Sequence, residues 1–222
     1  MSMNKQTFLF DLDGTLTDPK KGITKSVQYS LRAFGIHVEE PDELVCFIGP
    51  PLKDSYRDFY QFSDQEAGLA VDKYREYFSQ QGIFENTLYP GIKPMLERLM
   101  LSKAQLVVAT SKPTVYANQI LEHFGLDRYF DFVAGSELDG SRSKKSQVIQ
   151  HAIDNAKITD IRQAIMIGDR EHDIIGAKAH GMDAVGVLYG YGSRAELQGA
   201  NADYIAETVE ALSGLLQGLR GK

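Results

Sequence analysis

Two aspartates spaced one residue apart follow a short apolar run near the start of the chain, in the string Phe8-Leu9-Phe10-Asp11-Leu12-Asp13-Gly14-Thr15. The apolar run predicts a buried strand that ends at a glycine-containing turn. If the chain stays extended through Asp13, both carboxylates leave on the same side and repel each other unless a cation, a proton or donors compensate. The spacing therefore indicates a charge-compensated acidic site, with an Asx-turn at Asp13 and Gly14 as the alternative.

Two hydroxyl side chains, Thr110 and Ser111, follow a second apolar run from Gln105 to Ala109. The run predicts a strand, and Pro113 suits the first turn of a helix that continues to Phe124. A hydroxyl beside the free backbone N–H groups of a helix N-terminus forms an anion site. Capping of the helix is the alternative role for either hydroxyl.

A pair of lysines, Lys144 and Lys145, precedes a helix predicted from Ser146 to Ala156. A lysine at a helix start is unfavourable because the helix dipole prefers anions there. This conflict favours a functional role for one of the two lysines, and a solvated loop lysine is the alternative.

A second acidic group, Asp169 and Asp173, follows a strand predicted from Ala164 to Ile167. The spacing of four residues lets a turn and the start of a helix, predicted from Asp173 to His180, direct both carboxylates to one point. An acidic first turn that only stabilises its own helix is the alternative.

The elements that must position these residues alternate between strand and helix from Tyr89 onward, which is typical of a parallel α/β sheet. Ligands of open α/β sheets bind outside the carboxyl ends of the strands, where all four groups are predicted to lie. Only helical patterns separate the first strand from this region, in the stretches 18–35, 42–47, 52–62 and 64–81.

The composition excludes some classes of function. The chain has 222 residues and a net charge of −6, and the acidic balance argues against a nucleic-acid polymer as substrate because phosphate backbones require a basic face. The single cysteine, Cys46, suits a reducing cytoplasm. Neither a signal peptide nor a run of about 20 apolar residues is found, so we expect a cytoplasmic protein without a membrane partner.

The four strings resemble, in order, the four motifs of the haloacid dehalogenase-like (HAD) hydrolases. The resemblance implies that Asp11 is the nucleophile and Asp13 the general acid and base, and that Thr110, with Ser111, binds the substrate phosphate. It further implies a phosphate-binding lysine. The pattern Asp-Gly-x-Arg-x-x-Lys of the phosphoglycolate phosphatase-like branch favours Lys145, and Lys144 stays open. Mg²⁺ is the implied cofactor, held by Asp11, the backbone carbonyl of Asp13 and Asp169. Asp173 is implied either as a further ligand or as a residue that contacts the ligands without touching the metal.

The same resemblance implies a Rossmann-like three-layer α/β core with a parallel sheet and a small inserted all-α cap domain of the C1 type. The core is expected at residues 1–17 and 87–222, and the cap at residues 18–86. Gly49 and Lys53 match the specificity loop of the cap and are candidate substrate-binding residues.

The predicted function is Mg²⁺-dependent hydrolysis of a small phosphorylated metabolite through an aspartyl-phosphate, with phosphoglycolate ranked first. The alternatives are a 5′-nucleotidase acting on nucleoside monophosphates, and a sugar-phosphate phosphatase or phosphoglucomutase. A dehalogenase would not need Asp13, and a non-enzymatic binding protein would not need the full set of site residues. We expect a monomer or a weak homodimer.

Overall fold

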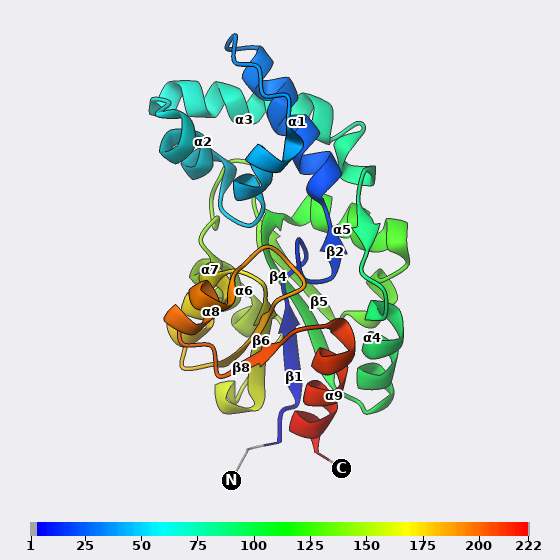
Figure 1. Ribbon diagram of the computed structural model, residues 1–222. Helices are drawn as coiled ribbons and strands as arrows, with labels where there is room; N and C mark the ends of the chain where they lie inside the picture. Colours follow the sequence, from blue (N-terminus) through cyan, green and yellow to red (C-terminus); the bar gives the residue numbers. More distant parts are fainter. Residues whose placement is uncertain (1–3, 222) are drawn as a thin grey trace. The chain divides into compact units, whose positions relative to one another are not determined.

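The chain forms two compact units in the computed structural model, which describes residues 4–221 (Figure 1). One unit comprises the chain up to Thr17 and from Leu88 onward, and the other is Asp18–Thr87. Among the helices of the described residues, none combines the length and apolar character of a membrane-spanning segment.

The first unit is built on a six-stranded sheet in the order β5-β4-β1-β6-β7-β8, in which all neighbours run parallel. Its strands are β1 (Thr7–Phe10), β4 (Gln105–Pro113), β5 (Phe132–Ser136), β6 (Ala164–Gly168), β7 (Asp183–Val187) and β8 (Tyr204–Ala206). In the central strand β1, Leu9 pairs with Val107 on one side and with Met166 on the other. All four residues of β1 are buried, because the strand is bonded on both sides and covered on both faces.

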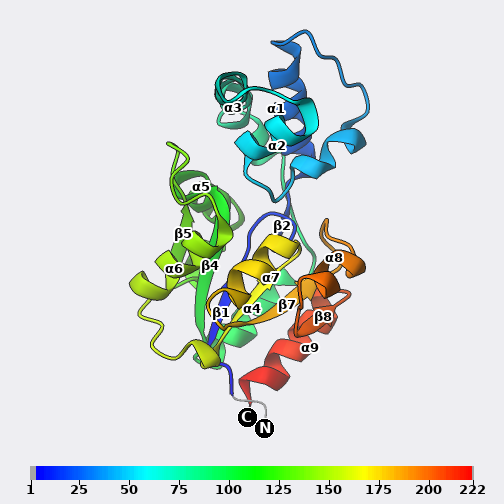
Figure 2. The same ribbon diagram turned by 90° about the vertical axis from the view of Figure 1, so that its left-hand side faces the viewer.

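Helices cover both faces of this sheet. The helices are α4 (Ile92–Leu101), α5 (Thr114–Phe124), α6 (Lys145–Asn155), α7 (Glu171–Lys178), α8 (Arg194–Gly199) and α9 (Val209–Arg220), with short 3₁₀ turns η3 (Asp127–Tyr129) and η4 (Ile161–Gln163). Helices α6 and α7 pack together on one face and α4 and α9 on the other (Figures 1 and 2). The prediction of a Rossmann-like α/β fold with a parallel sheet is therefore confirmed.

The second unit is helical and has its own apolar core. Helix α1 (Lys20–Arg32) packs on α3 (Asp64–Phe78) and on the 3₁₀ turns η1 (Pro41–Phe47) and η2 (Gly82–Phe84), and α2 (Leu52–Tyr60) packs on α3. Tyr56, Tyr74 and Phe78 are buried, whereas Phe59 is exposed. The two-residue strands β2 (Thr17–Asp18) and β3 (Thr87–Leu88) pair where the chain passes from one unit to the other.

Several predicted element bounds are wrong. Strand β4 continues through Thr110 to Pro113 with a register shift after Ala109, because Pro113 still pairs with Ser136 of β5. Helix α5 therefore begins at Thr114, not at Pro113. The stretch predicted as a helix from Asp42 is a 3₁₀ turn, α7 begins at Glu171 instead of Asp173, and α8 and the two short strands were not predicted.

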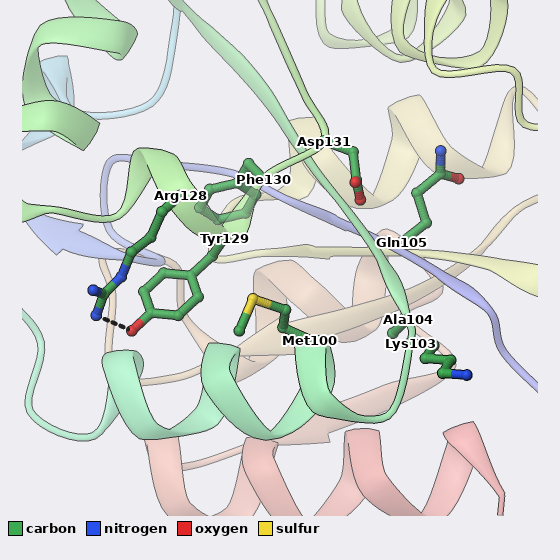
Figure 3. A pocket seen from close by; sticks show the side chains of 8 residues that line it. All are labelled: Met100, Lys103, Ala104, Gln105, Arg128, Tyr129, Phe130 and Asp131. Carbon is green, nitrogen blue, oxygen red and sulfur yellow. Dashed lines mark hydrogen bonds between the residues drawn. The ribbon is translucent and has the colours of Figure 1, made fainter.

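A pocket of about 510 Å³ lies at the amino ends of β4 and β5 (Figure 3). The site acids instead follow the carboxyl ends of β1 and β6. Arg128 donates a 2.8 Å hydrogen bond to the Tyr129 hydroxyl, and Asp131 accepts a 3.0 Å hydrogen bond from the backbone N–H of Leu106. None of the residues predicted to act in chemistry lines this pocket; its lining is Met100, Lys103, Ala104, Gln105, Arg128, Tyr129, Phe130 and Asp131.

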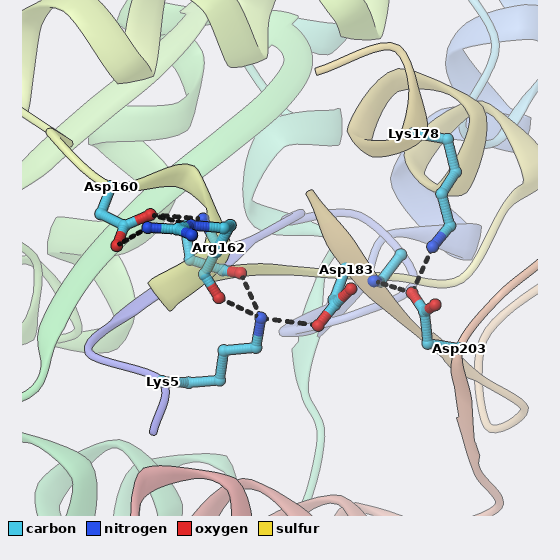
Figure 4. Close-up of polar contacts among 8 residues, drawn as sticks. Lys5, Asp160, Arg162, Lys178, Asp183 and Asp203 are labelled. Atoms are coloured by element: carbon cyan, nitrogen blue, oxygen red, sulfur yellow. Dashed lines mark hydrogen bonds and ion pairs between the residues drawn. The ribbon is translucent and has the colours of Figure 1, made fainter. Parts of the chain in front are cut away.

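A buried lysine connects three strands at their amino ends. Lys5 is 2% exposed, and its Nζ donates hydrogen bonds of 2.6 and 3.1 Å to the carbonyls of Arg162 and Ala164 (Figure 4). The same atom lies 2.6 Å from Asp183 Oδ2. Lys5 therefore connects the amino ends of β1, β6 and β7.

Candidate active site

The end of β1 directs the first two acids into the unit. The backbone N–H of Asp11 donates to the carbonyl of Ile167 at 2.9 Å, so Asp11 is still fixed to β6. Gly14 then adopts a positive φ of 82°, and its N–H donates to the Thr17 carbonyl at 2.7 Å. The resulting tight turn leaves Asp11 4% and Asp13 8% exposed.

The end of β6 supplies the second pair of acids, both completely buried. Asp173 lies in the first turn of α7, where its Oδ2 accepts the backbone N–H of Arg170 at 3.1 Å. Asp169 Oδ2 accepts the backbone N–H of Tyr191 at 2.8 Å, from the loop after β7.

Three of these acids form one cluster. Asp11, Asp169 and Asp173 each offer a carboxylate oxygen, and these oxygens lie within 4.8 Å of one another. Burial, together with the neighbouring carboxylates, raises the pKa of Asp169 well above its ordinary value. Burial also raises the pKa of Asp173, although the Lys145 ammonium opposes the shift. A cluster of this kind requires a cation to stay ionised.

One lysine of the predicted pair enters this cluster. Lys145 is 6% exposed, and its Nζ lies 2.8 Å from Asp11 Oδ1 and 2.7 Å from Asp173 Oδ1. Burial alone lowers the pKa of Lys145, but the attraction of Asp11 and Asp173 outweighs it and raises that pKa. Lys144 is instead the exposed N-cap residue of α6. The structure thus brings Lys145, not Lys144, to the acids.

The two predicted hydroxyls lie on the extended end of β4. Thr110 is 2% exposed, and its Oγ1 accepts the backbone N–H of Lys112 at 3.3 Å. Neither Thr110 nor Ser111 caps α5, whose start has no side-chain cap hydrogen bond. Lys145 Nζ donates to the carbonyl of Ala109 at 3.0 Å, so the residue before Thr110 contacts the lysine of the acid cluster.

A second lysine, Lys112, contacts the remaining acid and was given no role in the sequence analysis. Its Nζ lies 2.6 Å from Asp13 Oδ2, and both side chains are nearly buried. Burial raises the pKa of Asp13, and Lys112 opposes that shift. The signal in the sequence was a lysine directly after Thr110 and Ser111 at a strand end.

The loop after β7 backs the acid cluster. A Cβ added at Gly190 would lie 2.3 Å from the Gly14 carbonyl oxygen and 2.5 Å from Asp169 Cβ, and one added at Gly192 would lie 1.9 Å from the Asp169 carbonyl oxygen. The Tyr189 hydroxyl donates to the Thr15 carbonyl at 3.0 Å. Glycine is therefore required at 190 and 192 for the loop to reach Asp169.

The charges of the site fit a divalent cation. The four carboxylates Asp11, Asp13, Asp169 and Asp173 face the two ammonium groups of Lys112 and Lys145, which leaves an excess of two negative charges when all are ionised. A hard divalent cation prefers carboxylate oxygen ligands. Asp11, Asp169 and Asp173 are the residues that could hold one; ligation by the backbone carbonyl of Asp13 stays a prediction.

The two candidates outside this site, Gly49 and Lys53, belong to the helical unit. Gly49 has a positive φ of 105°, and Lys53 Nζ lies 3.8 Å from Asp64 Oδ1 on an exposed surface. Their part in substrate binding stays a prediction.

An open parallel sheet with acids, lysines and hydroxyls at the carboxyl ends of its central strands has the groups of an enzyme that transfers phosphoryl groups. The sequence model of the family described as haloacid dehalogenase-like hydrolase matches residues 8–187, and the chain belongs to this family. A crystal structure of a predicted phosphatase from Clostridium acetobutylicum superposes with a TM-score of 0.94 at 49% identity, covering 96% of this chain and 98% of that one.

Several related proteins also align with most of the chain. A Pseudomonas aeruginosa protein named 5′-nucleotidase is 44% identical over 94% of this chain and 94% of its own length. Tyrosine-protein kinase PtkA of Mycobacterium tuberculosis is 39% identical over 91% of this chain and 66% of its own length. A Vibrio parahaemolyticus protein named phosphoglycolate phosphatase is 24% identical over 91% of this chain and 92% of its own length. The family, the relative named 5′-nucleotidase and the structural neighbour together identify the chain as a phosphoric monoester hydrolase of the HAD-like type.

Proposed function

We propose that this protein hydrolyses small phosphomonoesters with the help of Mg²⁺ through a phosphorylated Asp11. The observation that carries the proposal is the cluster of Asp11, Asp169 and Asp173, whose oxygens lie within 4.8 Å of one another beside Lys145. When bound, Mg²⁺ would neutralise negative charge on the transferring phosphoryl group and on the carboxylates. Asp11, Asp169 and Asp173 would hold it.

The chain's own residues divide the reaction into two displacements. A carboxylate oxygen of Asp11 forms a bond to phosphorus while the bond to the leaving oxygen breaks, and Asp13 gives that oxygen a proton. A water molecule then attacks the phosphorus and loses its proton to Asp13 while the bond to Asp11 breaks. Lys145 and Thr110 stabilise the charge of the transferring group by donating to its oxygens.

The substrate class follows from charge and from the relatives. The net negative charge of the chain does not suit a nucleic-acid polymer as substrate, whereas local hydrogen-bond donors can bind the single phosphate of a small molecule. The sequence analysis ranked phosphoglycolate first, but the relative named 5′-nucleotidase is 44% identical and the one named phosphoglycolate phosphatase only 24%. We therefore rank nucleoside 5′-monophosphates first and phosphoglycolate second.

We also propose that the helical unit, Asp18–Thr87, is the cap domain that selects the substrate. Lys53 is half exposed and its ion pair with Asp64 is loose at 3.8 Å, so its ammonium can contact a second anionic group of a substrate. Lys53→Met should then raise KM for phosphoglycolate, which carries a carboxylate, and leave KM for p-nitrophenyl phosphate unchanged. An equal change for both substrates would contradict this role.

The test of the proposed function is phosphate release from nucleoside 5′-monophosphates, phosphoglycolate, sugar phosphates and p-nitrophenyl phosphate, with Mg²⁺ and with a chelator. Asp11→Asn should lower kcat by roughly 10⁴-fold or more, because it removes the nucleophile. Asp154→Asn is the matched control, since this exposed carboxylate of α6 accepts a hydrogen bond from Gln150 and is not one of the clustered acids. No release from any compound by folded wild-type protein would overturn the proposal.

A second candidate is transfer of the phosphoryl group from Asp11 to an acceptor hydroxyl in place of water. It is favoured by the relative named a tyrosine-protein kinase, and a phosphoglucomutase would use the same step. Phosphate appearing on an added sugar or tyrosine-containing peptide, faster than free phosphate is released, would support it.

A further inference from the structure

Lys112 and Asp13 form an ion pair that the mechanism above does not use. Lys112 Nζ lies 2.6 Å from Asp13 Oδ2, and the two side chains are 6% and 11% exposed. Asp13 Oδ1 is buried and has no hydrogen-bond partner among the described residues. Lys112 thus contacts one oxygen of this carboxylate, whereas the other oxygen accepts no hydrogen bond from the described residues.

The backbone of Lys112 is fixed on both sides. Its N–H donates to Thr110 Oγ1 at 3.3 Å, and Ser136 of β5 donates to the carbonyl of Ser111 at 2.8 Å. A Cβ added at Gly135 would lie 2.6 Å from the Lys112 carbonyl oxygen, so β5 packs directly against this residue. A lysine held in this way can restrict the orientation of the carboxylate it contacts.

The neighbouring aspartates Asp11 and Asp13 form ion pairs with different lysines. Lys145 contacts Asp11 and Asp173, whereas Lys112 contacts Asp13. Without Lys112, Asp13 could turn toward Lys145 or leave the site, since a buried carboxylate seeks the nearest cation.

We propose that Lys112 is a positioning residue that holds Asp13 by Oδ2 and thereby presents Oδ1 to the oxygen that leaves the phosphorus. The proposal rests on the proposed function, in which Asp13 donates a proton as the leaving oxygen separates from phosphorus and recovers one from the attacking water. Proton and electron balance close over the two steps: the ester and water become the free alcohol and phosphate, and Asp13 returns to its starting state.

If Lys112 positions Asp13, the loss of rate on removing Lys112 should depend on how strongly the leaving group of the substrate needs a proton. Phenol, with a pKa of about 10, needs a proton as it leaves, whereas p-nitrophenol is much more acidic and needs it less. Phenyl phosphate and p-nitrophenyl phosphate therefore form a matched pair of similar size. A misplaced Asp13 should slow the first of these substrates far more than the second.

The test compares kcat/KM of both substrates for the wild type, Lys112→Met, Lys112→Arg and Lys103→Met. Lys112→Met should lower kcat/KM by on the order of 10²-fold for phenyl phosphate, the usual contribution of acid catalysis, and by less than about 10-fold for p-nitrophenyl phosphate. Lys112→Arg should recover part of the difference because it keeps the charge. Lys103→Met removes an exposed lysine that lies two residues before the start of β4, at the opposite end of this strand from Lys112, and should change neither value.

The outcomes separate this inference from the proposed function. An equal loss with both substrates, or a rise in KM alone, would overturn the positioning role and assign Lys112 to substrate binding or to stability. If Lys112→Met does not fold, Lys112→Gln provides the same ratio. Absence of turnover in the wild type would overturn the proposed function, and the role of Lys112 with it.

Discussion

Substitution of Gly190 by alanine tests whether the loop after β7 fixes Asp169. The added Cβ would lie 2.3 Å from the Gly14 carbonyl oxygen and 2.5 Å from Asp169 Cβ. Since non-bonded carbon contacts lie at about 3.5–4.0 Å, Asp169 or the turn at Gly14 must move by about 1 Å. Overpacking of this kind costs about 1–3 kcal/mol. In a chain of this size each kcal/mol lowers Tm by about 2–4 °C.

The same displacement should weaken the binding of Mg²⁺, because a residue that orients a metal ligand typically contributes about 10–100-fold in affinity. Titration calorimetry with Mg²⁺ alone and thermal unfolding with a chelator measure the two effects separately. The matched control is Gly214→Ala in α9, where an added Cβ meets nothing within 4 Å. There the same change should stabilise the protein by about 0.5–1 kcal/mol. Wild-type Tm and Mg²⁺ affinity in Gly190→Ala would refute the reasoning.

Three further predictions concern charge. Lys145→Met should lower kcat/KM by roughly 10²–10³-fold while Mg²⁺ binds at least as tightly, because a cation next to the acids is removed; calorimetric loss of Mg²⁺ binding would contradict this. Burial raises the pKa values of Asp169 and Asp173, so the folded, metal-free protein binds protons more tightly than the unfolded chain. Its stability should fall as the pH rises from about 4 through these raised pKa values. The increase in Tm caused by Mg²⁺ should grow over the same range, since binding requires ionised carboxylates; an equal increase at about pH 5 and about pH 8 would count against it. Lys5→Met should cost about 2 kcal/mol because it unpairs Asp183 and two carbonyls, and it should leave kcat unchanged; a change in kcat with an unaltered Tm would show that the edge joined by Lys5 is not purely structural.

Local patterns were enough to predict the class of fold. Phe8, Leu9 and Phe10 of β1 lie inside the sheet and are completely buried, so apolar residues suit these positions. Alternating runs and helical patterns then predicted the parallel sheet, because these signals depend on neighbours in the chain. The extension of β4 to Pro113 was missed, since it depends on pairing with Ser136 of β5.

The candidate site shows the same division. The sequence by itself determined the residue types and their place at strand ends, and the resemblance to the HAD motifs that these strings carry singled out Asp11, Asp169 and Asp173. Only the tertiary structure chose between Lys144 and Lys145 and joined Lys112 to Asp13. The physical reason is that an ion pair or a glycine contact between distant segments depends on register and side-chain direction, and a local pattern carries no information on either.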